Sequence, residues 1–115
     1  MPIVLWFSRL RPGVSAEEYE EFVRSVDYPA TQRISSISRY RSIRLQGPAL
    51  GEEKLPYDFI DLAEITDIED YREDLEHHPA VHEVHGQFEK YVESLGNFWA
   101  VQIGEGAIRE SLDDG

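Results

Sequence analysis

All four histidines of this 115-residue chain lie in one short segment, His77 to His85, whose sequence is HHPAVHEVH. An imidazole exchanges a proton near neutral pH, and a neutral imidazole can also bind a metal ion. The segment is therefore open to three interpretations. It is an acid/base site, a metal site, or a helix surface whose histidines have no chemical role.

A metal site here would use His78, His82 and His85, because spacings of four and three residues bring side chains to one side of a helix. Zinc sites usually need three or four converging ligands, and Pro79 disturbs the helix directly after the first of these histidines. The chain also has no cysteine, which excludes thiolate ligands and disulfides. We therefore predict no metal, and nothing in the sequence requires another cofactor.

The acid/base interpretation depends first on His85 and second on His82. One face of the helix expected from Pro79 is apolar and contains Val81, Val84, Phe88, Tyr91, Val92 and Leu95. His85 lies at the edge of this apolar face, whereas His82 is turned about 100° from Val81 toward the polar flank. An imidazole that borders an apolar cleft can take or give a proton near pH 7.

The elements that carry these residues follow from hydrophobic periodicity and turn residues. We expect strands over residues 3–10, 39–46, 57–65 and 97–103. Capping boxes at Ser15–Glu18 and Thr66–Glu69 predict two helices, one ending before Pro29 and one near residue 76. A further helix is expected over residues 79–95, with Gly96 as its stop. Residues 31–37 fit either a loop or a short helix.

This β-α-β-β-α-β order predicts an α+β, ferredoxin-like domain, with helices on one face of a four-stranded antiparallel sheet. We place the domain at residues 1–104 and a polar C-terminal tail at 105–115. The first and last strands are mainly apolar on both faces, so one sheet face lacks a cover. A homodimer with its sheets face to face would bury it, and a monomer with some exposed apolar surface is the alternative.

The charge of the chain limits its partners. With 23 acidic and 11 basic residues, the formal net charge is −12. Such a protein repels phosphate backbones and anionic lipid surfaces, so we expect neither nucleic-acid nor membrane binding. No apolar run is long enough to span a bilayer and no signal-peptide pattern is present, which predicts a cytoplasmic protein.

Two further residue types can complete a site. Asp61 is a carboxylate in an apolar strand, which is unfavourable to bury unless it is paired. It could orient His85, accept an N–H group from a substrate, or lie at an exposed strand edge. Trp6 and Trp99 can stack on a flat aromatic ligand or simply fill a core.

The element order, together with Tyr71 and His78-Pro79 before the last helix, resembles the dimeric α/β-barrel superfamily. Members include stress-responsive barrel proteins, cofactor-free monooxygenases, haem-degrading enzymes and the plant cyclase that makes olivetolic acid. Within the superfamily, the strings VLWFSRLRPG and HHPAVHEVHG are similar to RedY-like (HapK-like) proteins encoded in prodiginine pigment pathways. The likeness extends over residues 2–104.

The resemblance implies a ligand site between sheet and helices and a dimer through the opposite sheet faces. It implies that Trp6, Ser8, Phe59 and Asp61 face the cleft. It also implies a planar, hydrophobic heteroaromatic ligand of the pyrrole or indole type.

The chain departs from the olivetolate-type cyclase, whose catalytic histidine stands two residues after the proline of His-Pro-x-His. That position is Val81 in this sequence, and Leu75 replaces the tyrosine that partners the histidine. His85 points in a similar direction one turn later, so the cyclase mechanism is not carried over whole.

Our leading hypothesis is a small homodimeric protein that steers cyclisation or condensation of a pathway intermediate without a cofactor. His85 would be the general acid or base and Asp61 its orienting partner, with Trp6, Phe59 and Phe88 as walls. One rival is a protein that only binds or chaperones the intermediate. Another is a cofactor-free oxygenase or haem-handling protein of the same fold.

Overall fold

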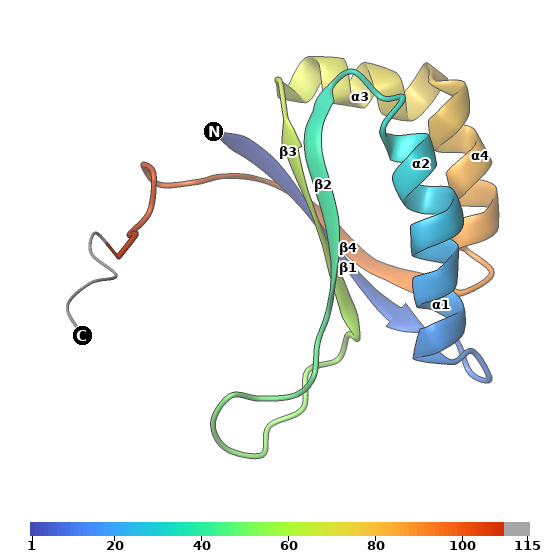
Figure 1. Cartoon of the computed structure of the whole chain (residues 1–115), viewed down its shortest axis with the longest axis vertical. Helices are drawn as coiled ribbons and strands as arrows, with labels where there is room; N and C mark the ends of the chain where they lie inside the picture. The colour runs from blue at the N-terminus through green and yellow to red at the C-terminus, as the bar shows by residue number, and fades with distance from the viewer. Residues whose placement is uncertain (110–115) are drawn as a thin grey trace.

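The computed structural model describes residues 1–109. In chain order its elements are β1 (Pro2–Leu10), α1 (Ala16–Phe22), η1 (Val23–Asp27), α2 (Tyr28–Thr31), β2 (Ile37–Arg44), β3 (Phe59–Ile65), α3 (Ile68–His77), α4 (Pro79–Phe88) and β4 (Val92–Val101). The strands form one antiparallel sheet in the order β2-β3-β1-β4, and the helices lie on one side of it (Figure 1). The predicted ferredoxin-like α+β fold is confirmed. The division into a domain at 1–104 and a tail at 105–115 stays a prediction, and residues 110–115 lie outside the described part.

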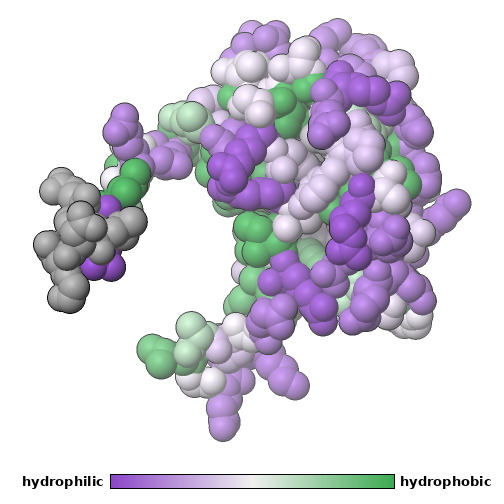
Figure 2. Space-filling model, viewed as in Figure 1, coloured by the Kyte–Doolittle hydropathy of each residue, from purple (hydrophilic) through white to green (hydrophobic). Residues whose placement is uncertain are grey.

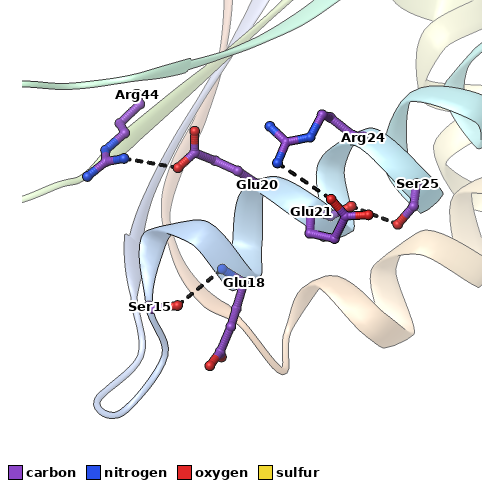
Figure 3. A network of polar contacts seen from close by, with 7 residues as sticks. All are labelled: Ser15, Glu18, Glu20, Glu21, Arg24, Ser25 and Arg44. Carbon is purple, nitrogen blue, oxygen red and sulfur yellow. Dashed lines mark hydrogen bonds and ion pairs between the residues drawn. The ribbon is translucent and has the colours of Figure 1, made fainter.

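The first helical segment starts as predicted but runs beyond its predicted end. The Ser15 hydroxyl accepts the backbone N–H of Glu18 at 3.1 Å and so caps α1 (Figure 3). The chain then continues through the π-helical turn η1 and through Pro29 in α2. A proline lacks an N–H group and its ring clashes with the carbonyl four residues earlier. The wider hydrogen-bond spacing of a π turn relieves that conflict, so the helix continues to Thr31.

The remaining helices start at side-chain caps. Asp67, one residue after the predicted Thr66, accepts the backbone N–H of Asp70 at 2.8 Å and begins α3. His78 begins α4, since its Nδ1 accepts the backbone N–H of Ala80 at 3.0 Å. Its Nε2 must then carry the proton and donate to the Arg33 carbonyl at 3.1 Å. His78 therefore joins the start of α4 to the end of the first helical segment.

The predicted end of the last helix was wrong. The helix stops at Phe88, and Val92 already belongs to β4, where it pairs with Leu10 and is buried. Strand pairing along all of β1 outweighs the helical spacing of the apolar residues. Gly96 is not a helix stop but lies opposite Phe7, next to an irregularity in the β1–β4 register. A side chain at Gly96 would run into the ring of Phe98.

The two faces of the sheet have different surroundings. The helix-covered face is buried at Val4, Ser8, Phe59, Asp61, Ala63 and Ile65. The opposite face, here called the outer face, is only partly covered. Its apolar residues are Ile3, Leu5, Phe7, Ile60, Leu62 and Phe98, and it also carries Arg39, Arg41 and Glu64. Figure 2 shows hydrophobic residues on this side, between the C-terminal segment and the long β2–β3 loop. At the edge of the sheet, Arg44 holds α1 through an ion pair with Glu20 at 3.1 Å (Figure 3).

Candidate functional site

A cleft lies between the helix-covered face of the sheet and the helices. Its cavity volume is about 60 Å³, compared with about 600 Å³ when the space open to solvent is included. The cleft is therefore narrow. Its walls are mainly apolar, and the predicted site residues among them are Trp6, Asp61, Val81, His85 and Phe88.

The other predicted site residues lie outside the cleft walls. Ser8 and Phe59 share the helix-covered face but are buried beneath α1, where the Tyr19 ring packs on Phe59 at 4.7 Å. Trp99 lies on the edge strand β4 with 58% of its surface exposed, and the Arg72 guanidinium sits 5.6 Å from its ring centre. Trp99 shares the helix-covered face with its pairing partner Val4, but in this edge strand its ring is covered only in part, by the Arg72 side chain of α3.

His82 is turned away from the cleft. The ring is exposed, and its Nε2 lies 2.7 Å from the carbonyl oxygen of Glu76. His77 is likewise exposed beside Glu73 and Glu76. Within residues 1–109, no group of three or more histidine and acidic side chains is arranged to hold a metal ion.

His85 lies in an aromatic part of the cleft. Its ring meets Trp6 edge to face with centroids 5.5 Å apart, and Phe88 is 6.4 Å away. The indole N–H of Trp6 donates to the Tyr71 hydroxyl at 3.0 Å, which fixes the orientation of this wall. Burial lowers the pKa of His85, and the charge of Glu89 offsets this in part. The imidazole is therefore neutral at pH 7 and able to accept a proton.

Asp61 is held by β2 rather than by His85. The Ser42 hydroxyl donates to its Oδ1 at 2.6 Å, and Asp61 itself is 2% exposed. Burial raises the pKa of Asp61 to about 7, with a further contribution from the charge of Asp27. Hydrogen bonding by Ser42 and Tyr40 acts in the opposite direction. No Asp61–His85 hydrogen bond is present in the described part of the chain, so direct orientation of the imidazole by Asp61 does not occur here.

A second buried carboxylate, which the sequence did not reveal, belongs to Asp27 in η1. The Tyr40 hydroxyl donates to Asp27 Oδ2 at 2.9 Å and the Thr31 hydroxyl to Oδ1 at 3.3 Å. Burial raises the pKa of Asp27 as well. Its spacing of four from Val23 and eight from Tyr19 was the available signal, because that spacing continues the apolar helix face.

Tyr40 and Tyr71 are two further cleft residues that were not predicted as site residues, although Tyr71 was part of the family resemblance. Tyr40 lies in β2 on the same face as Ser42, and Tyr71 lies at the sheet-facing side of α3. Both line the cleft and both hydroxyls contact groups already described. Strand parity alone leaves the face of Tyr40 open, since the residues of β2 alternate without a clearly apolar side.

The sequence profile of a family described as "REDY-like protein HapK" matches residues 2–103. The chain belongs to the HapK family. This match spans all the secondary-structure elements and the whole cleft. Among curated proteins, none matches the sequence.

Solved structures with the same fold include HapK from Hahella chejuensis, at 22% identity and a TM-score of 0.76, covering 95% of this chain and 99% of that one. Hydroxynitrile lyase from Passiflora edulis superposes with a TM-score of 0.67 at 15% identity, covering 89% and 94%. A protein described as dimeric and ferredoxin-like from Thermobifida fusca gives 0.60 at 17% identity, covering 86% of each chain. Identities this low establish the shared fold alone. No helix in the described residues is long and apolar enough to cross a membrane.

Proposed function

We propose that this HapK-family protein binds a planar pyrrole- or indole-like intermediate of prodiginine-type secondary metabolism and catalyses its condensation or cyclisation. One observation carries the proposal. A neutral imidazole, His85, and a buried acid whose pKa is about 7, Asp61, line the same narrow apolar cleft. A carboxyl group whose pKa is raised to about 7 can donate a proton near neutral pH, and an imidazole kept neutral by burial can accept one.

The proposed reaction joins a ring carbon to a carbonyl carbon. As the new carbon–carbon bond forms, the ring carbon loses its proton to Nδ1 or Nε2 of His85, and the carbonyl oxygen takes a proton from the Asp61 carboxylic acid. The product is a neutral carbinol, and the proton on His85 returns to Asp61 through solvent. Loss of one water molecule from the carbinol then gives the conjugated dipyrromethene-type product. Trp6 and Phe88 hold the flat ring by edge and face contacts.

The family resemblance supplies the ligand class, and the residues supply the chemistry. A flat heterocycle fits a narrow aromatic cleft better than a branched or flexible ligand of equal size. The same fold carries a lyase in Passiflora edulis, so the scaffold is compatible with catalysis. Asp61, which is not bonded to His85, fits the role of contacting the substrate better than that of orienting the imidazole.

We also propose that two copies associate through their outer faces. Phe98 is 56% exposed on this face, and its ring stands 5.7 Å from that of Phe7 in an apolar row across the strands. A contiguous apolar face of this kind is typical of an interface. Two solved structures of this fold are described as dimeric, which supports association of two copies of this chain.

The catalytic proposal is tested by condensing 2,4-dimethylpyrrole with pyrrole-2-carbaldehyde and following the coloured dipyrromethene in visible light. The wild-type protein should accelerate the reaction, and His85→Gln should reduce the acceleration by about a hundredfold or more. The matched control is His82→Gln, an exposed imidazole on the same helix, which should stay within about twofold. Unchanged rates in His85→Gln would contradict the catalytic role. Binding of 2,2′-bipyrrole without any acceleration would favour a protein that only holds its ligand.

A further inference from the structure

The charged groups that line the cleft are nearly all of one sign. Within the described residues, the cleft walls include three carboxylates, those of Asp27, Asp61 and Asp74, and no lysine or arginine. His85 is the one other group of the walls that can become charged below pH 7, and burial keeps it neutral. When these carboxyl groups are ionised, a ligand in this cleft therefore meets negative charge and no compensating cation from the protein.

Asp27 and Asp61 form one connected acidic group, and Tyr40 lies between them. The Tyr40 hydroxyl donates to Asp27, and hydrogen bonding by Tyr40 also lowers the pKa of Asp61. Asp27 is 3% exposed and Asp61 is 2% exposed, so solvent compensates neither carboxylate well. Two buried carboxylates that share hydroxyl donors but have no neighbouring cation repel each other and are unfavourable in their charged forms. Asp74, in contrast, is at the half-buried rim and accepts the hydroxyl of Ser36.

Two further buried polar groups near the acidic pair lack a well-formed hydrogen bond within the described residues. They are the Tyr19 hydroxyl and Ser8 Oγ, and Ser8 interacts with Tyr19 closely enough to lower its pKa in part. The charges of Asp61 and Asp27 both raise the pKa of Tyr19, after burial itself, so this hydroxyl stands within the field of the acidic pair. Neither Tyr19 nor Ser8 lines the cleft, so they describe the polar surroundings of the acidic pair and not a contact with the ligand.

We propose that the cleft selects a flat ligand carrying a cationic N–H group, such as an amidinium or a protonated imine, and excludes ligands carrying carboxylate or phosphate. The Asp61 and Asp27 carboxylates receive the cationic end, while Trp6 and Phe88 receive the ring. This inference rests on the proposed function and concerns the ionised form of Asp61. The acid form donates its proton in the proposed reaction, and the carboxylate, which is also populated near pH 7, is the form that binds a cationic N–H group.

Three further facts fit a cationic ligand. Charge-assisted hydrogen bonds from N–H groups to carboxylates are the strong ones, and a buried carboxylate gains most from them. A neutral His85 does not repel a cation. The net charge of −12 raises the local concentration of cations around the protein and lowers that of anions.

The test compares three probes that share a benzene ring and differ in charge: benzamidine, benzamide and benzoate. Binding is measured by isothermal titration calorimetry at pH 8, where Asp61 is mainly ionised. Benzamidine should bind at least about tenfold more tightly than benzamide. Benzoate should bind more weakly than benzamide.

Asp61→Asn should abolish most of the preference for benzamidine over benzamide while changing benzamide affinity by less than about threefold. Asp27→Asn provides a second variant with the same expected direction, in case one of the two fails to fold. The matched control is Glu64→Gln, which neutralises a carboxylate of the same strand on the outer face and should leave the preference unchanged.

The results separate this inference from the proposed function. Equal affinity for the three probes, a preference for benzoate, or an unchanged preference in both aspartate variants would overturn the charge selectivity. If indole still binds in those cases, the proposed cleft for flat heterocycles stands. If indole and all three benzene probes fail to bind, the proposed function fails together with the inference.

Discussion

The helix-covered face and the outer face of the sheet differ in where they place polar atoms. In β3 the buried side carries Asp61 between Phe59 and Ala63, whereas the less covered side carries Ile60 and Leu62. β1 repeats the pattern, since Ser8 is buried under the helices and its neighbour Phe7 lies on the outer face. A sheet with one solvated face usually shows the opposite distribution, apolar inside and polar outside.

This difference indicates that the stability of a single chain explains neither the buried carboxylate of the helix-covered face nor the exposed apolar residues of the outer face. A buried carboxylate without a cationic partner destabilises the fold, and an exposed apolar face favours association. The same fold would be more stable with a leucine at Asp61 and more soluble with polar residues at Leu5 or Leu62. A ligand in the cleft and a second copy on the outer face each supply the missing partner. The following predictions test the two faces separately, from the largest expected effect to the smallest.

The largest effect is expected from Asp61→Asn on stability at high pH. The folded-state pKa of about 7 lies above the ordinary value of 3.8, so the folded protein binds the proton more tightly. The free energy of unfolding therefore falls as pH rises from about 4 to about 7, by about 4 kcal/mol from this group. Asp61→Asn should remove most of this fall, of which about 3 kcal/mol lies between pH 5 and pH 8, the two conditions to compare by urea denaturation.

The control for that experiment is Glu64→Gln in the same strand but on the outer face, which should keep the pH dependence of the wild type. If Asp61→Asn and the wild type lost stability in parallel between pH 5 and pH 8, the cost assigned to the buried carboxylate would be wrong.

Leu62→Glu should weaken the proposed dimer. A two-fold interface buries this leucine twice, so the loss is about 3 kcal/mol and the dimer dissociates about a hundredfold more readily. Sedimentation equilibrium would show a monomer at micromolar concentration, with unchanged circular dichroism. Val101→Glu is the matched control, since Val101 is exposed but pairs with Pro2 on the other side of the sheet. A wild-type protein that is already monomeric would refute the proposed role of the outer face.

Trp6→Phe should lower the free energy of unfolding by about 1.5 kcal/mol. The substitution removes the indole N–H that donates to Tyr71 while keeping most of the ring. Tyr71→Phe is the second arm of a double-mutant cycle, and the two changes should be non-additive by about 1 kcal/mol. Additive losses would mean that this hydrogen bond does not hold the wall of the cleft.

The smallest effect is expected from Ser15→Ala, which removes the side-chain cap of α1 at a position on neither face. The loss in unfolding free energy should be about 1 kcal/mol. Neither the monomer–dimer equilibrium nor the binding of indole should change, and a change in either would show that stability and the two surfaces cannot be separated by these variants.

Much of the fold could be predicted from the sequence. Local signals with a clear physical cause were read correctly, such as the Ser15 cap and the order of strands and helices. The end of α4 was not, because the apolar residues after Phe88 fit a helical face and a strand equally well. Pairing with β1, a contact between distant parts of the chain, decides that Val92 belongs to a strand.

The candidate site could be predicted only in part, because local sequence patterns do not reveal contacts between distant parts of the chain. His85, Trp6 and Phe88 were found from type and spacing, and they do line one cleft. Asp27 falls inside the helix predicted before Pro29, but a carboxylate was not expected among the buried residues, although its spacing from Val23 and Tyr19 places it on the apolar face. Its partner Tyr40 comes from a strand thirteen residues later, and no local pattern connects the two.

The most direct test of the central claim is an NMR titration of the four histidine rings with 2,2′-bipyrrole at several pH values. His85 should titrate below the ordinary pKa of histidine, because burial disfavours its charged form. Its ring signals should be the ones that move when the ligand is added. His77 and His82, which are exposed, should stay unmoved by the ligand and serve as internal controls. Equal ligand shifts at His82 and His85, or shifts at His82 alone, would contradict a binding cleft built around His85.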